Sequence, residues 1–510
     1  MTFSLFLKKY TIPFIVFVTG ACVLVIEIVA TRILAPYFGN TIFSISSVLS
    51  VVLAALSIGY YAGGRIADKH PSEKLFYSII ALSGACVVIL HIIGIGFLSF
   101  FGYKLSITWG PLFTSFLLFF FQSLLLGTLS PFAIKIQSLN LEQTGIGSIS
   151  GDIFFWSTLG SIFGSLLTGF FLIPNLGINT IIFSVGFLLI VLGLWPLIKI
   201  NFWIKLFLFL ITLALYLSFT HNVESIIHSF DLKSMVYSNE ALYQKITIYD
   251  GVYENKPARF LFQDRNPSAV AFINSNELAA PYTKYYSLYQ IFNPDIKQAL
   301  MIGAGAYSVP KDLLYKKPQT IIDVVEIEPS LLELGKKYFN VPDNPKLTTI
   351  VADGRRFLID SPKKYDLIFS DAYSSIYSTP LHLTTQEFFT LAKSKLTNKG
   401  VFIANVIGSL SDKPQSFAMS EIKTFQSVFK NNYFFAVNDL SHSDLQNIIF
   451  VGYNGDNIIN VNDKVVKNNS DPIISNLAQK KIDLSKFDFS SHSILTDNFA
   501  PVEYLISKEL

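Results

Sequence analysis

Seven long apolar stretches in the first half of the chain constrain its fold more than any other feature of the sequence. A helix needs about 20 predominantly apolar residues to cross the hydrocarbon core of a bilayer. Helices are the expected form, because a spanning segment must satisfy its backbone hydrogen bonds internally. The sequence therefore predicts a multi-pass, all-α domain in the cell membrane over residues 1–225, in contact with lipid. Its expected spans are 12–34, 42–63, 76–101, 109–131, 151–173, 178–198 and 203–220.

The basic residues at the ends of these stretches indicate an orientation. Most of them fall on the side of the N-terminus, which the positive-inside rule assigns to the cytoplasm. Seven spans would then place the second half of the chain on the opposite side of the membrane. If the stretch 203–220 lies in the interface or re-enters, the second half returns to the cytoplasm. The sequence leaves both arrangements open.

Two features inside the apolar stretches stand out from lipid-facing residues. Glu27 is an ionisable residue near mid-membrane, where a charge is costly unless it is paired or faces a cavity. Two interpretations of Glu27 are equally good. It is either a relay or substrate contact, or it forms an ion pair with Arg32 or a hydrogen bond to a neighbouring span. The sequence GSIFG at 160–164 places two glycines four residues apart, which predicts close helix packing.

The charge and the cysteines point to no special partner. The formal net charge is +3, and the second half carries acidic and basic residues in similar numbers, so we expect no nucleic acid partner. Cys22 and Cys86 lie in apolar stretches, which indicates neither a disulfide framework nor a cysteine metal site. The histidines show no metal-ligand spacing, and His382 is expected to be a loop or helix-start residue. We therefore predict no metal.

The second half changes to short strands and helices. Residues 235–295 contain segments such as YQKITIYDG and ARFLFQD, which predict a small antiparallel sheet followed by a linking helix. From 296 to 510, apolar strands alternate with helices. This alternation is typical of a parallel, doubly wound, Rossmann-like α/β sheet, whose ligands bind beyond the carboxyl ends of the strands.

Four strand ends of this predicted sheet carry residues suited to an adenosyl ligand. Gly303 and Gly305 let the backbone approach a ligand, and Glu326 stands at a spacing suited to the two ribose hydroxyls. Asp353 and Asp371 follow the next two strands. Ser308 takes the place of the third glycine of a dinucleotide site, so an S-adenosyl compound is favoured over NAD.

The chain resembles spermidine synthases, which are polyamine aminopropyltransferases, in a form fused to a multi-span membrane domain. The motifs that carry the resemblance are DVVEIEPSLLELGKKYF, VADGRRF, YDLIFSDAYSS and LTDNFAPVEYL in the second half, and STLGSIFGSLLTGFFLIPNLG in the first. The resemblance implies decarboxylated S-adenosylmethionine as co-substrate, methylthioadenosine as product, a small polyamine such as putrescine as acceptor, and a homodimer.

The resemblance also implies roles for individual residues. Asp371 matches the aspartate that takes a proton from the attacking amine, and Tyr282 matches a tyrosine on the substrate side. The residues that match contacts to the donor nucleoside are Gln244 for the thioadenosine, Glu326 for the ribose, and Asp353 with Gly354 for the adenine.

The amine side of the family's site is less well matched. Ala306 stands where the synthases have an acid that holds the aminopropyl ammonium, and Ser374 stands where a second acid faces the diamine. Leu288 replaces a histidine of the polyamine pocket. Asp264 and Glu277 are possible replacement carboxylates that the sequence does not place.

Three functional hypotheses follow from these observations. The first is a membrane-tethered aminopropyltransferase with Asp371 as proton acceptor. The second is a methyltransferase that uses S-adenosylmethionine. The third is a transporter or sensor that binds a polyamine or thioadenosine without turning it over.

Overall fold

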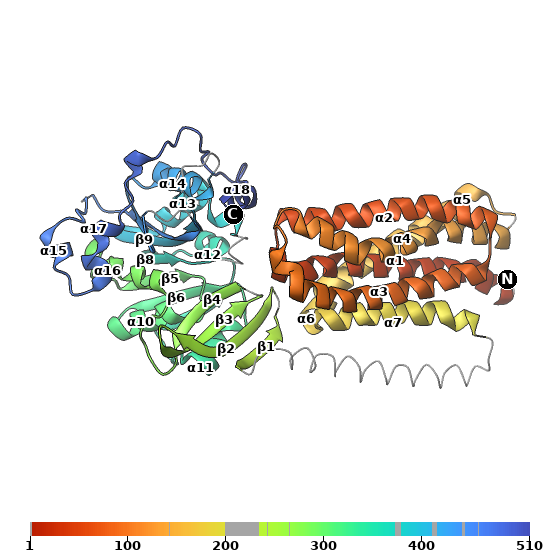
Figure 1. Ribbon diagram of the computed structural model, residues 1–510, viewed down its shortest axis with the longest axis horizontal. Coiled ribbons are helices and arrows are strands. Elements are labelled where there is room, and N and C mark those ends of the chain that lie inside the picture. Colours follow the sequence, from red (N-terminus) through yellow and green to blue (C-terminus); the bar gives the residue numbers. More distant parts are fainter. Residues whose placement is uncertain are drawn as a thin grey trace. The chain divides into compact units, whose positions relative to one another are not determined.

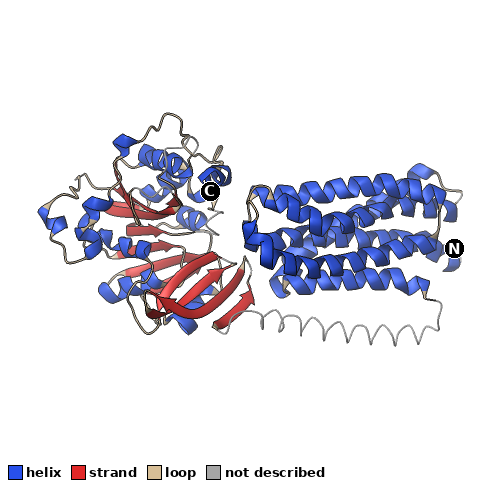
Figure 2. Cartoon of the chain, viewed as in Figure 1, coloured by secondary structure: helices blue, strands red, loops and turns tan. Residues whose placement is uncertain are grey.

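The computed structural model describes residues 3–141, 143–198, 234–241, 243–264, 266–372, 379–410, 416–440, 444–456 and 458–509. The chain divides into two compact units, Met1–Lys233 and Ser234–Leu510. The first, which we call the helical unit, is built from long helices. The second, the α/β unit, contains two sheets with helices packed on them (Figures 1 and 2). This is the fold class that the apolar stretches and the alternating strands predict.

Six helices among the described residues of the helical unit are long and apolar enough to cross a membrane. They are α1 (Phe3–Phe38), α2 (Ile42–Lys69), α3 (Glu73–Phe101), α4 (Gly110–Asn140), α5 (Ile146–Leu167) and α7 (Ile178–Leu197). A short 3₁₀ helix, η1 (Gly102–Lys104), follows α3, while the π-helical turn η2 (Thr168–Leu172) and α6 (Ile173–Asn175) extend α5. These helices match six of the predicted spans, and the seventh, 203–220, lies outside the described residues.

Two glycines let α5 approach α1 closely. A Cβ atom on Gly160 would lie 2.0 Å from the carbonyl oxygen of Phe17, and one on Gly164 would lie 2.4 Å from that of Ala21. No side chain fits at such distances, so the GSIFG motif serves close helix packing, as its spacing predicts. Glu27 lies partly buried in α1, and its role stays a prediction.

The α/β unit begins with a four-stranded antiparallel sheet in the order β1-β2-β3-β4. Its strands are β1 (Met235–Glu240), β2 (Lys245–Tyr253), β3 (Lys256–Gln263) and β4 (Asn266–Phe272). The segment after it, expected to be one helix, is a 3₁₀ helix, η3 (Pro281–Leu288), followed by a single α-helical turn, α9 (Tyr289–Phe292).

The second sheet has seven strands in the order β10-β11-β9-β8-β5-β6-β7. The strands β5 to β9 are parallel, whereas β11 runs antiparallel to both β9 and β10. The sheet is therefore doubly wound with an antiparallel edge. The bounds are β5 (Gln298–Ile302), β6 (Ile321–Glu326), β7 (Leu347–Val351), β8 (Tyr365–Ser370), β9 (Leu396–Gly408), β10 (Asn431–Ala436) and β11 (Gln446–Tyr453).

Helices cover both faces of this sheet because successive side chains of each buried strand point to opposite faces. On one face, Ala299 and Met301 of β5 pack with α10 (Ser308–Lys316) and α11 (Leu331–Phe339). Residues of η3 and α9 belong to the same core. Leu300 and Ile302 pack on the other face, which is covered by α12 (Gly354–Asp360), α13 (Gln386–Ser394), α14 (Phe417–Val428) and α18 (Val502–Glu509). The short elements are η4 (Leu381–Leu383), α15 (Lys464–Lys467), α16 (Pro472–Ser475), α17 (Leu477–Lys480) and η5 (Leu484–Lys486).

The packing of α5 on α1 predicts unequal effects for two glycine-to-alanine changes in the same helix. We expect Gly160→Ala to destabilise the full-length protein by about 1–3 kcal/mol, because its Cβ atom overlaps the backbone of Phe17. Gly151→Ala is the matched control, since a Cβ atom there meets nothing within 4 Å. Thermal unfolding of both variants in the same detergent tests this expectation. Equal melting temperatures for the two would contradict it.

Candidate functional site

The carboxyl ends of β5, β6, β7 and β8 lie at one edge of the large sheet. These strands are parallel, in the order β8-β5-β6-β7. The segments at this edge carry Gly303, Glu326, Asp353 and Asp371. The structure therefore brings the predicted strand-end residues to the edge where ligands of such sheets bind.

Gly303 lets the loop after β5 pass directly over the loop after β8. The backbone N–H of Asp371 donates to the carbonyl oxygen of Ile302 at 2.8 Å. A Cβ atom on Gly303 would lie 2.3 Å from the carbonyl oxygen of Asp371. Gly303 also has a φ of 89°, which glycine adopts without steric cost. A side chain here would force the Asp371 loop away from β5.

Glu326, at the end of β6, is tied to the backbone around it. The N–H of Ala304 donates to Oε2 at 2.8 Å, and the N–H of Glu328 donates to Oε1 at 2.9 Å. Glu326 is only 7% exposed. Burial raises its pKa, while the backbone hydrogen bonds oppose that rise. Each carboxylate oxygen has a second lone pair, so Glu326 is held rigidly and can still accept hydrogen bonds from a ligand.

Asp353 caps a helix and also contacts a histidine. Its Oδ1 accepts a hydrogen bond from the N–H of Arg356 at 2.8 Å, which makes it the N-cap of α12. Its Oδ2 lies 2.6 Å from Nε2 of His382 in η4. Gly354 packs against β5, since a Cβ atom there would lie 2.5 Å from Cγ2 of Ile302. A ligand at Asp353 would therefore share the carboxylate with His382.

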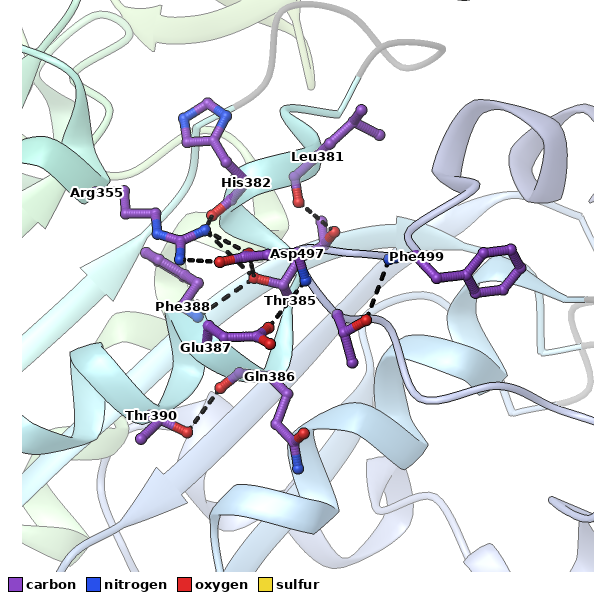
Figure 3. A network of polar contacts seen from close by, with 12 residues as sticks. Arg355, Leu381, His382, Thr385, Gln386, Glu387, Phe388, Thr390, Asp497 and Phe499 are labelled. Carbon is purple, nitrogen blue, oxygen red and sulfur yellow. Dashed lines mark hydrogen bonds and ion pairs between the residues drawn. The ribbon is translucent and has the colours of Figure 1, made fainter.

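A polar network joins the chain near residue 497 to the same region (Figure 3). Arg355 donates to both carboxylate oxygens of Asp497, at 2.7 and 2.5 Å, and this cation lowers the pKa of Asp497. Arg355 also donates to the carbonyl oxygen of His382 at 3.2 Å. Thr385 donates to Asp497 at 2.7 Å, and the N–H of Asp497 donates to Glu387 at 3.0 Å. The network thereby supports the loop that carries His382.

Asp371 lies partly buried between two hydrogen-bond donors. Asn405 on β9 donates its Nδ2 to Oδ1 of Asp371 at 2.9 Å, and Tyr282 on η3 donates its hydroxyl to the same carboxylate. Both donors favour the ionised form, but burial outweighs them and raises the pKa of Asp371 to about 6. Burial and, to a smaller extent, the nearby Asp371 raise the pKa of Tyr282. Asp371 is therefore a carboxylate that is ionised at neutral pH and more basic than an ordinary aspartate.

Two residues of this edge were not predicted from the sequence. His382 was expected to be a loop or helix-start residue, and nothing in the sequence pairs it with Asp353. Asn405 does carry a signal, because it is an amide inside the apolar strand segment VFIANVI, where an apolar residue would be expected.

The remaining predicted residues have other surroundings or are not described. Gln244 lies partly buried before β2, where its carbonyl oxygen accepts a hydrogen bond from the N–H of Ala241. Ala306 and Leu288 are buried in the core, and Ser374 lies outside the described residues. The two possible replacement carboxylates have other partners. Asp264 accepts from the N–H of Lys245, and Glu277 pairs with Lys256 at the surface.

Parts of this chain are similar to known proteins. The model of the spermine/spermidine synthase domain family matches residues 287–441. A polyamine aminopropyltransferase of Vibrio vulnificus (strain CMCP6) is 27% identical over 221 residues, which are 40% of this chain and 68% of that protein. A probable polyamine aminopropyl transferase of Bifidobacterium longum (strain NCC 2705) is 35% identical over 133 residues, 26% of this chain and 29% of that protein.

Among solved structures, a probable spermidine synthase from Corynebacterium glutamicum ATCC 13032 is 20% identical, with a TM-score of 0.43. The likeness covers 50% of this chain and 95% of that one. The family match spans β5 to β10 and includes Glu326, Asp353, Asp371 and Asn405. The C-terminal region thus contains a spermine/spermidine synthase domain, which confirms the resemblance found in the sequence.

Proposed function

We propose that this protein is a membrane-tethered aminopropyltransferase that transfers an aminopropyl group from decarboxylated S-adenosylmethionine to a small amine such as putrescine. The observation that carries the proposal is Asp371, a partly buried carboxylate at the end of β8, held by Tyr282 and Asn405 within a synthase domain. The apolar helices of the helical unit support the tether.

The proposed reaction is a displacement at a carbon activated by a sulfonium. The amine nitrogen forms a bond to that carbon, the carbon–sulfur bond breaks with its electron pair going to sulfur, and methylthioadenosine leaves. Only a neutral amine has the lone pair for this attack, yet a free alkylamine has a pKa near 10. Asp371 accepts the proton that the nitrogen must lose. Because its pKa is about 6, it is ionised at neutral pH and a better acceptor than an ordinary aspartate.

The nucleoside contacts follow the resemblance and are part of the proposal. Glu326 would accept from the ribose hydroxyls with its remaining lone pairs, and Asp353 with Gly354 would contact the adenine. The thioadenosine would lie near Gln244, and Tyr282 would lie on the amine side. A homodimer is proposed on the same ground.

Donor binding is the first test. We expect the purified full-length protein to bind methylthioadenosine and decarboxylated S-adenosylmethionine more tightly than S-adenosylmethionine, because Ala306 offers no partner to a donor carboxylate. Glu326→Gln should weaken binding about tenfold or more, through the loss of charged hydrogen bonds. Glu333→Gln, the same change at an exposed position of α11, is the control. Isothermal titration measures the binding of each ligand to the unchanged protein and to the two variants.

Two results of this titration would overturn the proposal. A preference for S-adenosylmethionine would instead indicate a methyltransferase. Absence of donor binding would favour the transporter or sensor hypothesis.

Asp371→Asn tests the chemical step. We expect it to lower kcat by a factor of about 10²–10⁴, the usual contribution of a general base, and to leave donor binding intact. Asp360→Asn, on the exposed end of α12, should retain full activity. Transfer is measured as release of methylthioadenosine. Full turnover by Asp371→Asn would show that this carboxylate is not the proton acceptor.

The pH dependence of kcat/KM reports the proton on Asp371. Because its folded pKa is raised to about 6, the active carboxylate is lost as pH falls through that value. Tyr282→Phe removes a donor that favours the ionised form, so its acid limb should move to higher pH. The amine titrates identically in both proteins, so the difference between the two profiles isolates Asp371. Superimposable profiles would contradict the assigned contact.

A further inference from the structure

A chain of side-chain amides leads from β11 to Asp371. Asn447 on β11 donates its Nδ2 to Oδ1 of Asn405 at 2.9 Å, and Asn405 donates its own Nδ2 to Asp371 at 2.9 Å. The sheet register creates this arrangement. Ser370 pairs with Ala404, so Asp371 follows beside Asn405, and Asn447 is diagonal to Asn405 across the β9–β11 pair.

The two ends of an asparagine amide have nearly the same shape and opposite hydrogen-bonding character. If the Asn405 amide were turned over, its Oδ1 would face the carboxylate of Asp371, and two acceptors would repel each other. Asn405 is only 4% exposed, so bulk water cannot compensate for the wrong orientation. The hydrogen bond from Asn447 favours one orientation, because only Oδ1 of Asn405 can accept it.

We propose that Asn447 is a positioning residue that fixes which end of the Asn405 amide faces Asp371. It acts through Asn405 and does not itself contact the carboxylate in this arrangement. The significance of this role for catalysis rests on the proposed function, whereas its effect on the Asp371 carboxyl group does not depend on turnover.

The surroundings of Asp371 make the effect measurable. Among the described residues, Tyr282 is the titratable side chain that contacts Asp371, and it approaches from η3. Asn405 supplies the second donor from β9. Loss of a donor, or its replacement by an acceptor, destabilises the ionised form and raises the pKa of Asp371 above its value of about 6.

Infrared titration of the full-length protein in detergent tests the proposal. The C=O stretching band of a protonated carboxyl group that disappears in Asp371→Asn reports this residue. We expect the midpoint of that band to rise by about one pH unit or more in Asn447→Leu. In Asn447→Asp, which keeps the shape and offers Asn405 an acceptor, the rise should be larger.

A double variant separates a positioning role from a general loss of packing. Asn405→Leu alone should raise the midpoint, and adding Asn447→Leu should raise it no further, because the intermediary is already gone. Asn454, the residue after β11, is the control, because its amide donates to the carbonyl oxygen of Thr397. Asn454→Leu should leave the midpoint unchanged. An unchanged midpoint in both Asn447 variants, or additive shifts in the double variant, would overturn the proposal.

The infrared measurement also separates this inference from the proposed function. A band that shifts as expected in a protein that transfers no aminopropyl group would support the positioning role and refute the proposed reaction. Transfer activity with an unmoved band would support the proposed reaction and refute the positioning role.

Discussion

The backbone of Gly303 lies against the carbonyl group of Asp371, and this contact sets the spacing between the two strand ends at the centre of the candidate site. β5 is the middle strand of the parallel part of the sheet, with β8 on one side and β6 on the other. The loop after β5 can therefore touch Asp371 through Gly303 and Glu326 through Ala304. A bulkier residue at 303 would separate Asp371, the proposed proton acceptor, from the residues proposed to hold the nucleoside.

Much of this architecture could be predicted because it depends on local patterns. Long apolar stretches predict spanning helices, and apolar strands alternating with helices predict a parallel sheet. In a parallel sheet the strand ends meet at one edge, so the sequence alone groups Gly303, Glu326, Asp353 and Asp371. The helix expected after the small sheet is mostly a 3₁₀ helix, a distinction that hydrophobic periodicity does not resolve.

Partners across the fold could not be predicted, since they depend on register and on distant loops. Asn405 reaches Asp371 because β8 and β9 pair in one particular register. His382 meets Asp353 because a loop returns to the start of α12. The sequence predicts that Asp353 contacts the nucleoside, and this stays a prediction; the contacts of its carboxylate with the start of α12 and with His382 come from the structure alone. Ala306 and Leu288 are buried in the core, as their apolar character predicts.

The ion pair between Arg355 and Asp497 joins residues that are 142 positions apart in the sequence. During synthesis, Arg355 leaves the ribosome long before Asp497 does, and for that time the loop of His382 lacks this support. The strands β5 to β7 precede Arg355 in the sequence, and β8 to β11 lie between Arg355 and Asp497. All seven strands can therefore pair before the ion pair forms. The contacts that hold the loop of His382 beside Asp353 therefore cannot all form until residue 497 has been synthesised.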